Sequence, residues 1–194
     1  MLESLRIVDT KILLWINGEH NAFLDFIMFW ASDKLIWIPF YILLLATLYR
    51  NYQKQTLLFL PVVALLIAGC DQLSGFIKNS TMRFRPCHEP SLNGMIHLVH
   101  DYCGGDYGFV SSHAANSVGL TTFMFMMLPN GNKKIRVALI VYVLLIGYSR
   151  MYLAAHYPLD ILGGWTVGFV LGFTFAKLLQ QKIKVPEIII SNNE

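Results

Sequence analysis

A histidine and an aspartate stand where an otherwise apolar chain turns polar. His156 lies four residues before Asp160, and Arg150 lies six residues before His156. Ionisable residues beside apolar segments are costly to maintain, so such a cluster is typical of a functional site. Pro158 suits the first turn of a helix. The carboxylate of Asp160 can then accept the Nδ1–H of His156 and fix the tautomer of its ring. Taken alone, the pair also fits a structural contact or a helix cap.

Two more cations belong with this cluster. Lys78 and Arg85 follow the apolar run 56–77. Arginine grips phosphate oxygens in a fork, and lysine acts on them as a point charge. Together with Arg150, these side chains can neutralise a dianion such as a phosphate ester.

A third polar segment opens the apolar run 109–128. Ser111 and Ser112 stand where a helix N-terminus presents free N–H groups, which makes a ready anion site. His113 follows them. His113 and His156 can supply proton transfer and nucleophilic attack near neutral pH. These residues suit phosphoryl transfer without a metal or other cofactor, because fixed cations can stabilise the equatorial oxygens while one histidine attacks and the other protonates the leaving oxygen.

The three segments together resemble the type 2 phosphatidic acid phosphatase family, which shares its site with bacterial acid phosphatases and vanadium haloperoxidases. The motifs are K-x6-R-P at Lys78–Pro86, S-x-H at Ser111–His113 and S-R-x5-H-x3-D at Ser149–Asp160. They occur in the family's order and with its internal spacing. The second motif is usually P-S-G-H in the family. Here Val110 replaces the proline and Ser112 replaces the glycine, so Ser112 must offer its backbone N–H with a side chain attached.

The resemblance implies a role for each residue. His156 would be the nucleophile that forms a phosphohistidine, Asp160 would orient it, and His113 would be the general acid. The phosphate would be held by Lys78, Arg85, Ser111, Ser112 and Arg150. Arg83 lies outside the usual signature, and two interpretations stay open for it: a contact with the substrate head group, or a solvated charge.

Composition predicts an integral membrane protein. Of 194 residues, 55% are hydrophobic and 14% are charged, whereas ordinary globular chains carry about 25% charged residues. We expect an all-α membrane bundle of about five to six transmembrane helices, forming one phosphatase domain over residues 1–194. The predicted spans are Leu35–Tyr49, Thr56–Ile77, Phe109–Leu128, Ile135–Tyr148 and Leu159–Leu179.

The N-terminal region, residues 1–32, is predicted to lie at the membrane surface. Residues 1–19 form an amphipathic pattern with an apolar stripe of Leu5, Val8, Ile12, Trp15 and Ile16, interrupted by Glu3, Arg6, Asp9 and Lys11.

Within the bundle, the small residues Gly164, Gly168 and Gly172 recur at four-residue spacing and predict a closely packed helix face. Asp71 is expected to face the bundle interior and to bond Gln72 or a neighbouring helix.

Basic residues predict the orientation. If successive spans cross the membrane in alternating directions, eight basic residues lie on the same side, which should be cytoplasmic. They are Arg50, Lys54, Lys133, Lys134, Arg136, Lys177, Lys182 and Lys184. The motifs and the loop 79–108 then face the extracytoplasmic side. There, Cys87 and Cys103 favour a disulfide over free thiols. A metal site built from these cysteines and the loop histidines is the alternative, although no standard ligand spacing is present.

The sequence therefore predicts a lipid phosphatase in the cell inner membrane, with its site on the extracytoplasmic face and membrane lipid as its surroundings. Candidate substrates are undecaprenyl diphosphate, lipid A phosphate, phosphatidylglycerol phosphate and phosphatidic acid. A phosphotransferase and a non-catalytic phospholipid-binding or transport protein remain open. Soluble haloperoxidase chemistry fits the apolar spans poorly, and a net charge of +3 gives no reason to expect nucleic acid. The oligomeric state stays open.

Overall fold

The computed structural model describes residues 2–129 and 132–183, and these residues build a bundle of α-helices without a β-sheet. The helices are α1 (Leu2–Gly18), α2 (Ala22–Ser32), α3 (Ile38–Tyr52), α4 (Phe59–Thr81), α5 (Ser112–Met127), α6 (Lys133–Tyr152) and α7 (Pro158–Gln180). Short 3-10 turns occupy Leu35–Trp37, Gln53–Leu58, Pro86–His88, Pro90–Leu92 and Val99–Asp101. The prediction of an all-α fold is confirmed.

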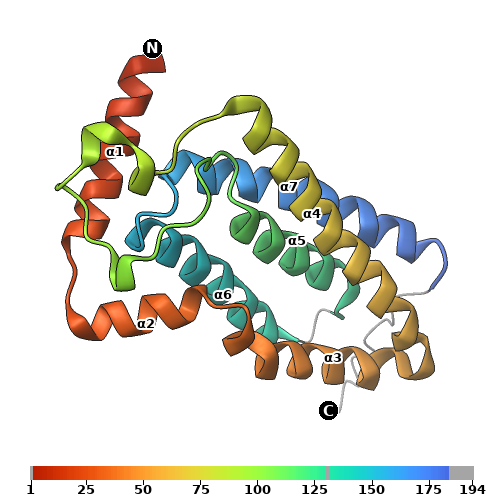
Figure 1. The fold of residues 1–194 in the computed structure, drawn as a ribbon. Helices are drawn as coiled ribbons and strands as arrows, with labels where there is room; N and C mark the ends of the chain where they lie inside the picture. Colours follow the sequence, from red (N-terminus) through yellow and green to blue (C-terminus); the bar gives the residue numbers. More distant parts are fainter. Residues whose placement is uncertain (1, 130–131, 184–194) are drawn as a thin grey trace.

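Helix α5 occupies the middle of the bundle, with α4, α6 and α7 packed around it (Figure 1). Its side chains Phe123, Met124 and Met127 are almost fully buried and join Phe59 and Leu139 in the main apolar core. No residue of α5 is exposed, which fits a helix whose apolar residues are not confined to one stripe.

A glycine stripe holds α5 and α7 together, as the sequence predicted. A Cβ built on Gly164, Gly168 or Gly172 would collide with a backbone carbonyl oxygen of α5. Only a residue without a side chain allows such an approach of two helix backbones. The stripe therefore fixes the start of α5 against the start of α7.

Three helical stretches are long and apolar enough to cross a membrane: Leu35–Thr81, Lys133–Tyr152 and Pro158–Gln180. The first joins two of the predicted spans, because the turn Gln53–Leu58 continues from α3 into α4. Helix α5 begins at Ser112, later than the predicted Phe109, and has 16 residues. The exact number of crossings stays a prediction.

Helix α1 has the predicted amphipathic character, but Asp9 faces the bundle rather than water. Val8 and Trp15, on the predicted apolar stripe, are 53% and 69% exposed, whereas Asp9 is 2% exposed. Asp9, Leu13 and Ile16 follow helical spacing and share the face that packs on the bundle. Apart from Ile16, the predicted apolar stripe thus points outward, and a buried carboxylate points inward.

The predicted basic set gathers at one end of the bundle. Arg136 donates from Nη2 to the carbonyls of Phe125 and Leu128, and Gln180 donates to the carbonyl of Met126. These contacts bring the end of α5, the start of α6 and the end of α7 to one end of the bundle. The basic residues that were predicted to be cytoplasmic lie on or beside these three segments or at the turn between α3 and α4. Lys184, which belongs to the same group, is outside the described residues. The motifs lie at the opposite end.

Candidate active site

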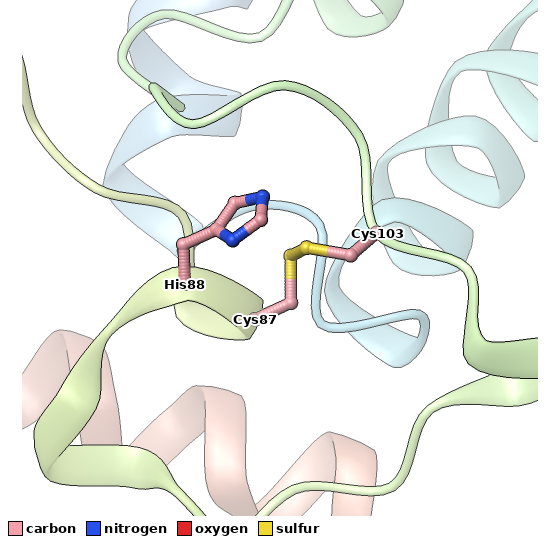
Figure 2. A group of neighbouring side chains, drawn as sticks. All are labelled: Cys87, His88 and Cys103. Carbon is pink, nitrogen blue, oxygen red and sulfur yellow. A yellow bond between two sulfur atoms is a disulfide. The ribbon is translucent and has the colours of Figure 1, made fainter.

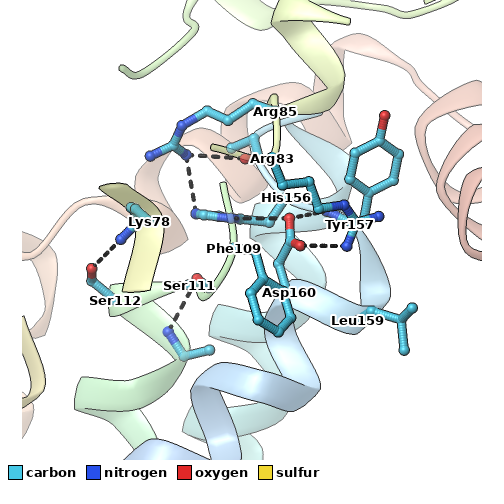
Figure 3. Close-up of polar contacts among 12 residues, drawn as sticks. Lys78, Arg83, Arg85, Phe109, Ser111, Ser112, His156, Tyr157, Leu159 and Asp160 are labelled. Atoms are coloured by element: carbon cyan, nitrogen blue, oxygen red, sulfur yellow. Dashed lines mark hydrogen bonds and ion pairs between the residues drawn. The ribbon is translucent and has the colours of Figure 1, made fainter. Parts of the chain in front are cut away.

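The three motifs meet at one end of the bundle, although up to 82 residues separate them in the chain (Figure 3). Lys78 comes from the last turn of α4, and Arg85 comes from the loop after it. Ser111 and Ser112 form the N-terminus of α5. His156 comes from the turn between α6 and α7, and Asp160 comes from the first turn of α7. The sequence motifs therefore assemble into one cluster.

His156 is held in a tight turn and is 1% exposed. The amides of Ala155 and His156 both donate to the carbonyl of Arg150, at 3.0 and 3.2 Å, and Ala154 adopts a left-handed backbone with φ 50°. Pro158 starts α7 immediately afterwards. This backbone leaves the imidazole little freedom to move.

The two nitrogens of His156 have different partners. Nε2 lies 3.0 Å from Nη1 of Arg85. A guanidinium group only donates, so Nε2 must accept, and the proton of the neutral ring resides on Nδ1. Nδ1 faces Oδ2 of Asp160 at 3.5 Å, which is longer than a normal hydrogen bond. Within the described part of the chain, Nδ1 has no other polar partner. The nucleophilic lone pair is thus on Nε2.

Burial of His156 also sets its charge. Desolvation, with help from the nearby Arg150 and Arg85 cations, holds the pKa of the imidazole well below its ordinary value of 6.5. The ring is therefore neutral at pH 7. A neutral imidazole is the form that can attack phosphorus.

The carboxylate of Asp160 is fixed by two hydrogen-bond donors. Its Oδ1 accepts from Nη1 of Arg83 at 2.7 Å, and its Oδ2 accepts from the backbone N–H of Tyr157 at 2.9 Å and faces His156. The contact with Tyr157 also caps the first turn of α7. Asp160 is fully buried, so these contacts decide which way it points.

The start of α5 provides an anion site next to these groups. Ser111 is the N-cap, and its Oγ accepts from the N–H of Ala114 at 3.4 Å. The Ser111 N–H donates to the carbonyl of Asp160 at 2.9 Å, which ties the start of α5 to α7. Lys78 donates from Nζ to Oγ of Ser112 at 2.5 Å. The first N–H groups of a helix lack intrahelical partners, so this end suits a phosphate.

Backbone carbonyls orient Arg85. Its Nε donates to the carbonyl of Gly105 at 2.5 Å, and its Nη1 donates to the carbonyl of Ala155 at 3.0 Å. The guanidinium therefore lies between the loop after Cys103 and the turn that carries His156. This loop crosses directly over Arg85, because a Cβ on Gly104 would lie 3.2 Å from Cζ of Arg85.

Two predicted residues lie beside the cluster rather than in its hydrogen-bond network. Arg150 is 2% exposed and donates from Nη1 to Oγ of Ser32 in α2. Its Cζ lies 5.7 Å from the ring centroid of Tyr102. His113 points to an apolar cavity next to the cluster.

That cavity has a volume of about 550 Å³ and lies between α3, α4, α5 and α6. His113 and Asn116 supply polar groups on its α5 wall, and Asp33 and Lys34 line it at the start of α3. Most of its lining is apolar. Some lining side chains, such as Ile42 at 61%, are exposed at the bundle surface, so the cavity reaches the apolar outer face.

The predicted disulfide is present between Cys87 and Cys103, with the two Cα atoms 6.0 Å apart (Figure 2). His88 lies beside it and bonds the carbonyl of Gly104 at 2.9 Å. The three side chains are close enough to surround a metal ion. A metal would need the thiolates, however, and the disulfide occupies both sulfurs. The geometry favours the disulfide over the metal site.

Two predictions about individual polar residues have clear outcomes. Asp71 accepts from Nδ2 of Asn116 in α5 at 2.8 Å, as expected for a polar group facing the bundle. Arg83 contacts Asp160 and Asp9 through 2.7 and 2.5 Å ion pairs, and its side chain is 21% exposed. The interpretation of Arg83 as a solvated charge is therefore wrong. The helical phase that Asp9 shares with Leu13 and Ile16 indicates a buried carboxylate, but it does not indicate Arg83 as the partner.

The chain is similar to several known proteins. The family model of the PAP2 superfamily matches residues 56–184. The Lipid A 4'-phosphatase of Bacteroides thetaiotaomicron is 33% identical over 178 residues, which is 90% of this chain and 78% of that protein. Undecaprenyl-diphosphatase BcrC of Bacillus subtilis is 29% identical over 173 residues, covering 87% of this chain and 82% of the relative.

The fold is also similar to that of a solved structure. The transmembrane PAP2 type phosphatidylglycerolphosphate phosphatase from Bacillus subtilis superposes with a TM-score of 0.67 at 21% identity, covering 93% of this chain and 88% of that chain. The family model covers most of the chain and includes all three motifs. This membrane phosphatase therefore belongs to the PAP2 superfamily.

Proposed function

We propose that the enzyme hydrolyses a phosphomonoester of a lipid A-type glycolipid through a phosphohistidine on His156, without a metal or other cofactor. One observation carries the mechanism: the lone pair of Nε2 is directed at the cationic group of Arg85, while Nδ1 faces the carboxylate of Asp160. This polarity suits attack on a phosphoryl group held by Arg85.

In the first step, Nε2 of His156 attacks phosphorus, and the bond between phosphorus and the lipid oxygen breaks. His113 donates a proton to that oxygen. In the second step, water attacks phosphorus, the phosphorus–nitrogen bond breaks and His113 accepts the proton from the water. Five groups would hold the phosphoryl oxygens: Lys78, Arg85, Arg150, Ser111 and the Ser112 N–H. Such fixed donors are worth most where charge develops in the transition state.

The apolar cavity supports a lipid substrate. His113 lines it, so the leaving oxygen would lie where the phosphate site meets the cavity. The apolar part of the substrate would then fill the cavity and continue along the exposed apolar side chains of α3 and α4. A phosphate lipid can thus react without leaving the bilayer.

Similarity favours lipid A phosphate as the substrate, because the Bacteroides lipid A 4'-phosphatase is 33% identical over most of this chain. Undecaprenyl diphosphate is the second candidate. Lys34 lines the same cavity and would supply a cation for the second phosphate of a diphosphate.

The same proposal covers the domain and its surroundings. Residues 1–194 form one phosphatase domain, in which residues 1–32 lie at the interface and residues 79–108 form an extracytoplasmic loop. The basic end of the bundle faces the cytoplasm of the cell, so the site opens on the outer face of the inner membrane.

Phosphate release by the purified protein tests this function. The substrates are lipid A phosphate, undecaprenyl diphosphate, phosphatidylglycerol phosphate and phosphatidic acid. We expect strongest release from lipid A phosphate, undiminished in EDTA and lost in His156→Ala. The matched control is His20→Ala, which changes an exposed histidine of the N-terminal region.

Other outcomes would contradict specific parts. Equal rates for His156→Ala and the unchanged enzyme would overturn the nucleophile assignment. Substrate loss without release of inorganic phosphate would indicate a phosphotransferase, and tight binding without turnover would indicate a binding protein. Activity lost in EDTA and restored by a metal would overturn the metal-free mechanism.

A further inference from the structure

Arg83 lies between two buried carboxylates from distant parts of the chain. Its Nη1 donates to Oδ1 of Asp160 at 2.7 Å, and its Nη2 donates to Oδ2 of Asp9 at 2.5 Å. The side chains of Asp9 and Asp160 are 1% and 0% exposed. A buried charge requires a partner, and here one guanidinium serves two carboxylates.

The hydrogen bond from Arg83 limits the rotation of the Asp160 carboxylate. A carboxylate turns easily about its bond to Cβ unless both oxygens are held. Oδ2 is held by the N–H of Tyr157 and faces His156, so Arg83 supplies the contact that holds Oδ1. Losing it would let Oδ2 turn away from Nδ1 of His156.

Asp9 in turn fixes Arg83. Besides accepting from Arg83, Asp9 accepts from the N–H of Leu159 at 2.8 Å, through its other oxygen. Leu159 belongs to the first turn of α7, the turn that also carries Asp160. The ring of Tyr157 covers the guanidinium, with Cζ of Arg83 4.3 Å from the ring centroid. Arg83 therefore has one available orientation.

The charges fit the reaction. Two carboxylates and one guanidinium leave a net charge of −1 in a buried network next to His156. The imidazole becomes cationic when Nε2 attacks phosphorus. A net negative network that touches Nδ1 favours that state over the neutral ring.

We infer that Arg83 is a positioning residue that holds Asp160 toward His156, and that Asp9 of α1 is the anchor that holds Arg83. This inference rests on the proposed role of His156 as the nucleophile. It makes the N-terminal helix, which lies before the family-model match at residues 56–184, part of the apparatus for catalysis.

The test compares kcat and KM for Arg83→Gln, Arg83→Lys and Asp9→Asn, with Arg50→Gln as a matched control on an exposed arginine. Small misplacement of a reacting group costs on the order of 100-fold in rate. We therefore expect kcat to fall by about that factor in Arg83→Gln, with KM changed by less than about threefold. Arg83→Lys should recover part of the loss. Asp9→Asn should lower kcat in the same direction, and adding it to Arg83→Gln should cause little further loss.

Repeating the Arg83→Gln change in an Asp160→Asn enzyme distinguishes a role in positioning Asp160 from general damage to the fold. Phosphoenzyme formation is measured with an aryl phosphate, whose good leaving group keeps slow variants measurable. If Arg83 acts through Asp160, then Arg83→Gln should cost less than about threefold in an Asp160→Asn enzyme. Equal losses in both backgrounds would overturn the inference.

Other results distinguish failure of this inference from failure of the proposed function. A rise in KM alone would assign Arg83 to the substrate head group, and unchanged kcat in both Arg83→Gln and Asp9→Asn would overturn the inference as well. If His156→Ala and Asp160→Asn stay active, the proposed function fails instead. If those two lose activity while Arg83→Gln does not, only this inference fails.

Discussion

Nη1 of Arg85 lies 3.0 Å from Nε2 of His156, so an arginine and the proposed nucleophile share a hydrogen bond. The bond selects the tautomer with its lone pair on Nε2 before any substrate arrives. An arriving phosphoryl group would take over the N–H of Arg85 and receive the lone pair at the same place. The resting arrangement is thus oriented for attack.

The pH dependence of kcat/KM follows from the neutral state of His156, because kcat/KM reports the ionisation of the free enzyme. Because the pKa of His156 is held well below 6.5, the imidazole stays neutral, and competent, as the pH falls through 6.5. We expect the acid limb of kcat/KM to have its midpoint below pH 6.5. Arg85→Gln removes a cation that lowers this pKa, so its limb should move to higher pH. Rate measurements at substrate concentrations well below KM check both; a midpoint at or above 6.5 in the unchanged enzyme would contradict the prediction.

Leaving-group dependence tests His113. A general acid typically contributes about 10²- to 10⁴-fold when the leaving oxygen needs a proton. His113→Asn should therefore lower kcat by that range for an alkyl phosphate lipid. The loss should be much smaller for an aryl phosphate, whose oxygen leaves as a stable anion. Phosphoenzyme formation with both ester types is the measurement, and equal losses would mean that His113 does not protonate the leaving group.

Stability measurements test the glycine stripe. A Cβ on Gly168 would collide with the carbonyl of Ala115 and lie 2.8 Å from the N of Gly119. Gly168→Ala should destabilise the enzyme by about 1–3 kcal/mol and lower activity, because α5 carries the anion site. Gly75→Ala is the control: nothing lies within 4 Å of a Cβ there, so the same change should be neutral or slightly stabilising. Thermal unfolding in detergent compares the two, and equal shifts would rule out backbone contact as the cause.

Reduction of the disulfide should weaken phosphate binding. The bridge ties Cys103 to Cys87, beside Arg85, and the loop after Cys103 supplies the Gly105 carbonyl that orients Arg85. Cys87→Ser with Cys103→Ser should raise KM more than it lowers kcat, and should reduce stability by about 2–4 kcal/mol.

A membrane-impermeant thiol reagent checks the bridge directly in whole cells. A Cys70→Ser background removes the buried free thiol. Labelling only after reduction is expected, and it would also assign the loop to the outer face. Labelling without reductant would refute the disulfide in the cell.

Much of this site could be predicted from the sequence, because its residues recur at short fixed spacings. His156 and Asp160 are four residues apart, on either side of the start of a helix. Ser111 to His113 lie together at the start of another helix. The glycine stripe was equally readable, since helical spacing puts small residues on one face. These features depend on local geometry alone.

Other features depend on long-range packing, and the sequence could not predict them. Arg83 contacts Asp9 across 74 residues of chain, and nothing local indicates that pairing. Arg150 was expected among the phosphate ligands, and the structure adds a contact that the sequence did not indicate, in which it donates to Ser32 of α2. Hydropathy alone placed the start of this span at Phe109, whereas the two serines correctly indicated the helix N-terminus, whose N-cap is Ser111. Apolar residues before a cap resemble helix in composition but not in hydrogen bonding.

The bond between Asp9 and Leu159 spans 150 residues, from the first helix to the last. A ribosome adds about 5–20 residues per second, so Asp9 emerges on the order of 10 s before the amide it will bind. During that interval α1 carries an unmatched carboxylate on its inward face and an apolar stripe on its outward face. Helix α1 can lie on the lipid surface during this time, with the carboxylate of Asp9 in water. Docking of α1 can then be completed only after Leu159 has been synthesised, so we expect a newly made chain to reach full activity only after α1 has packed against the start of α7.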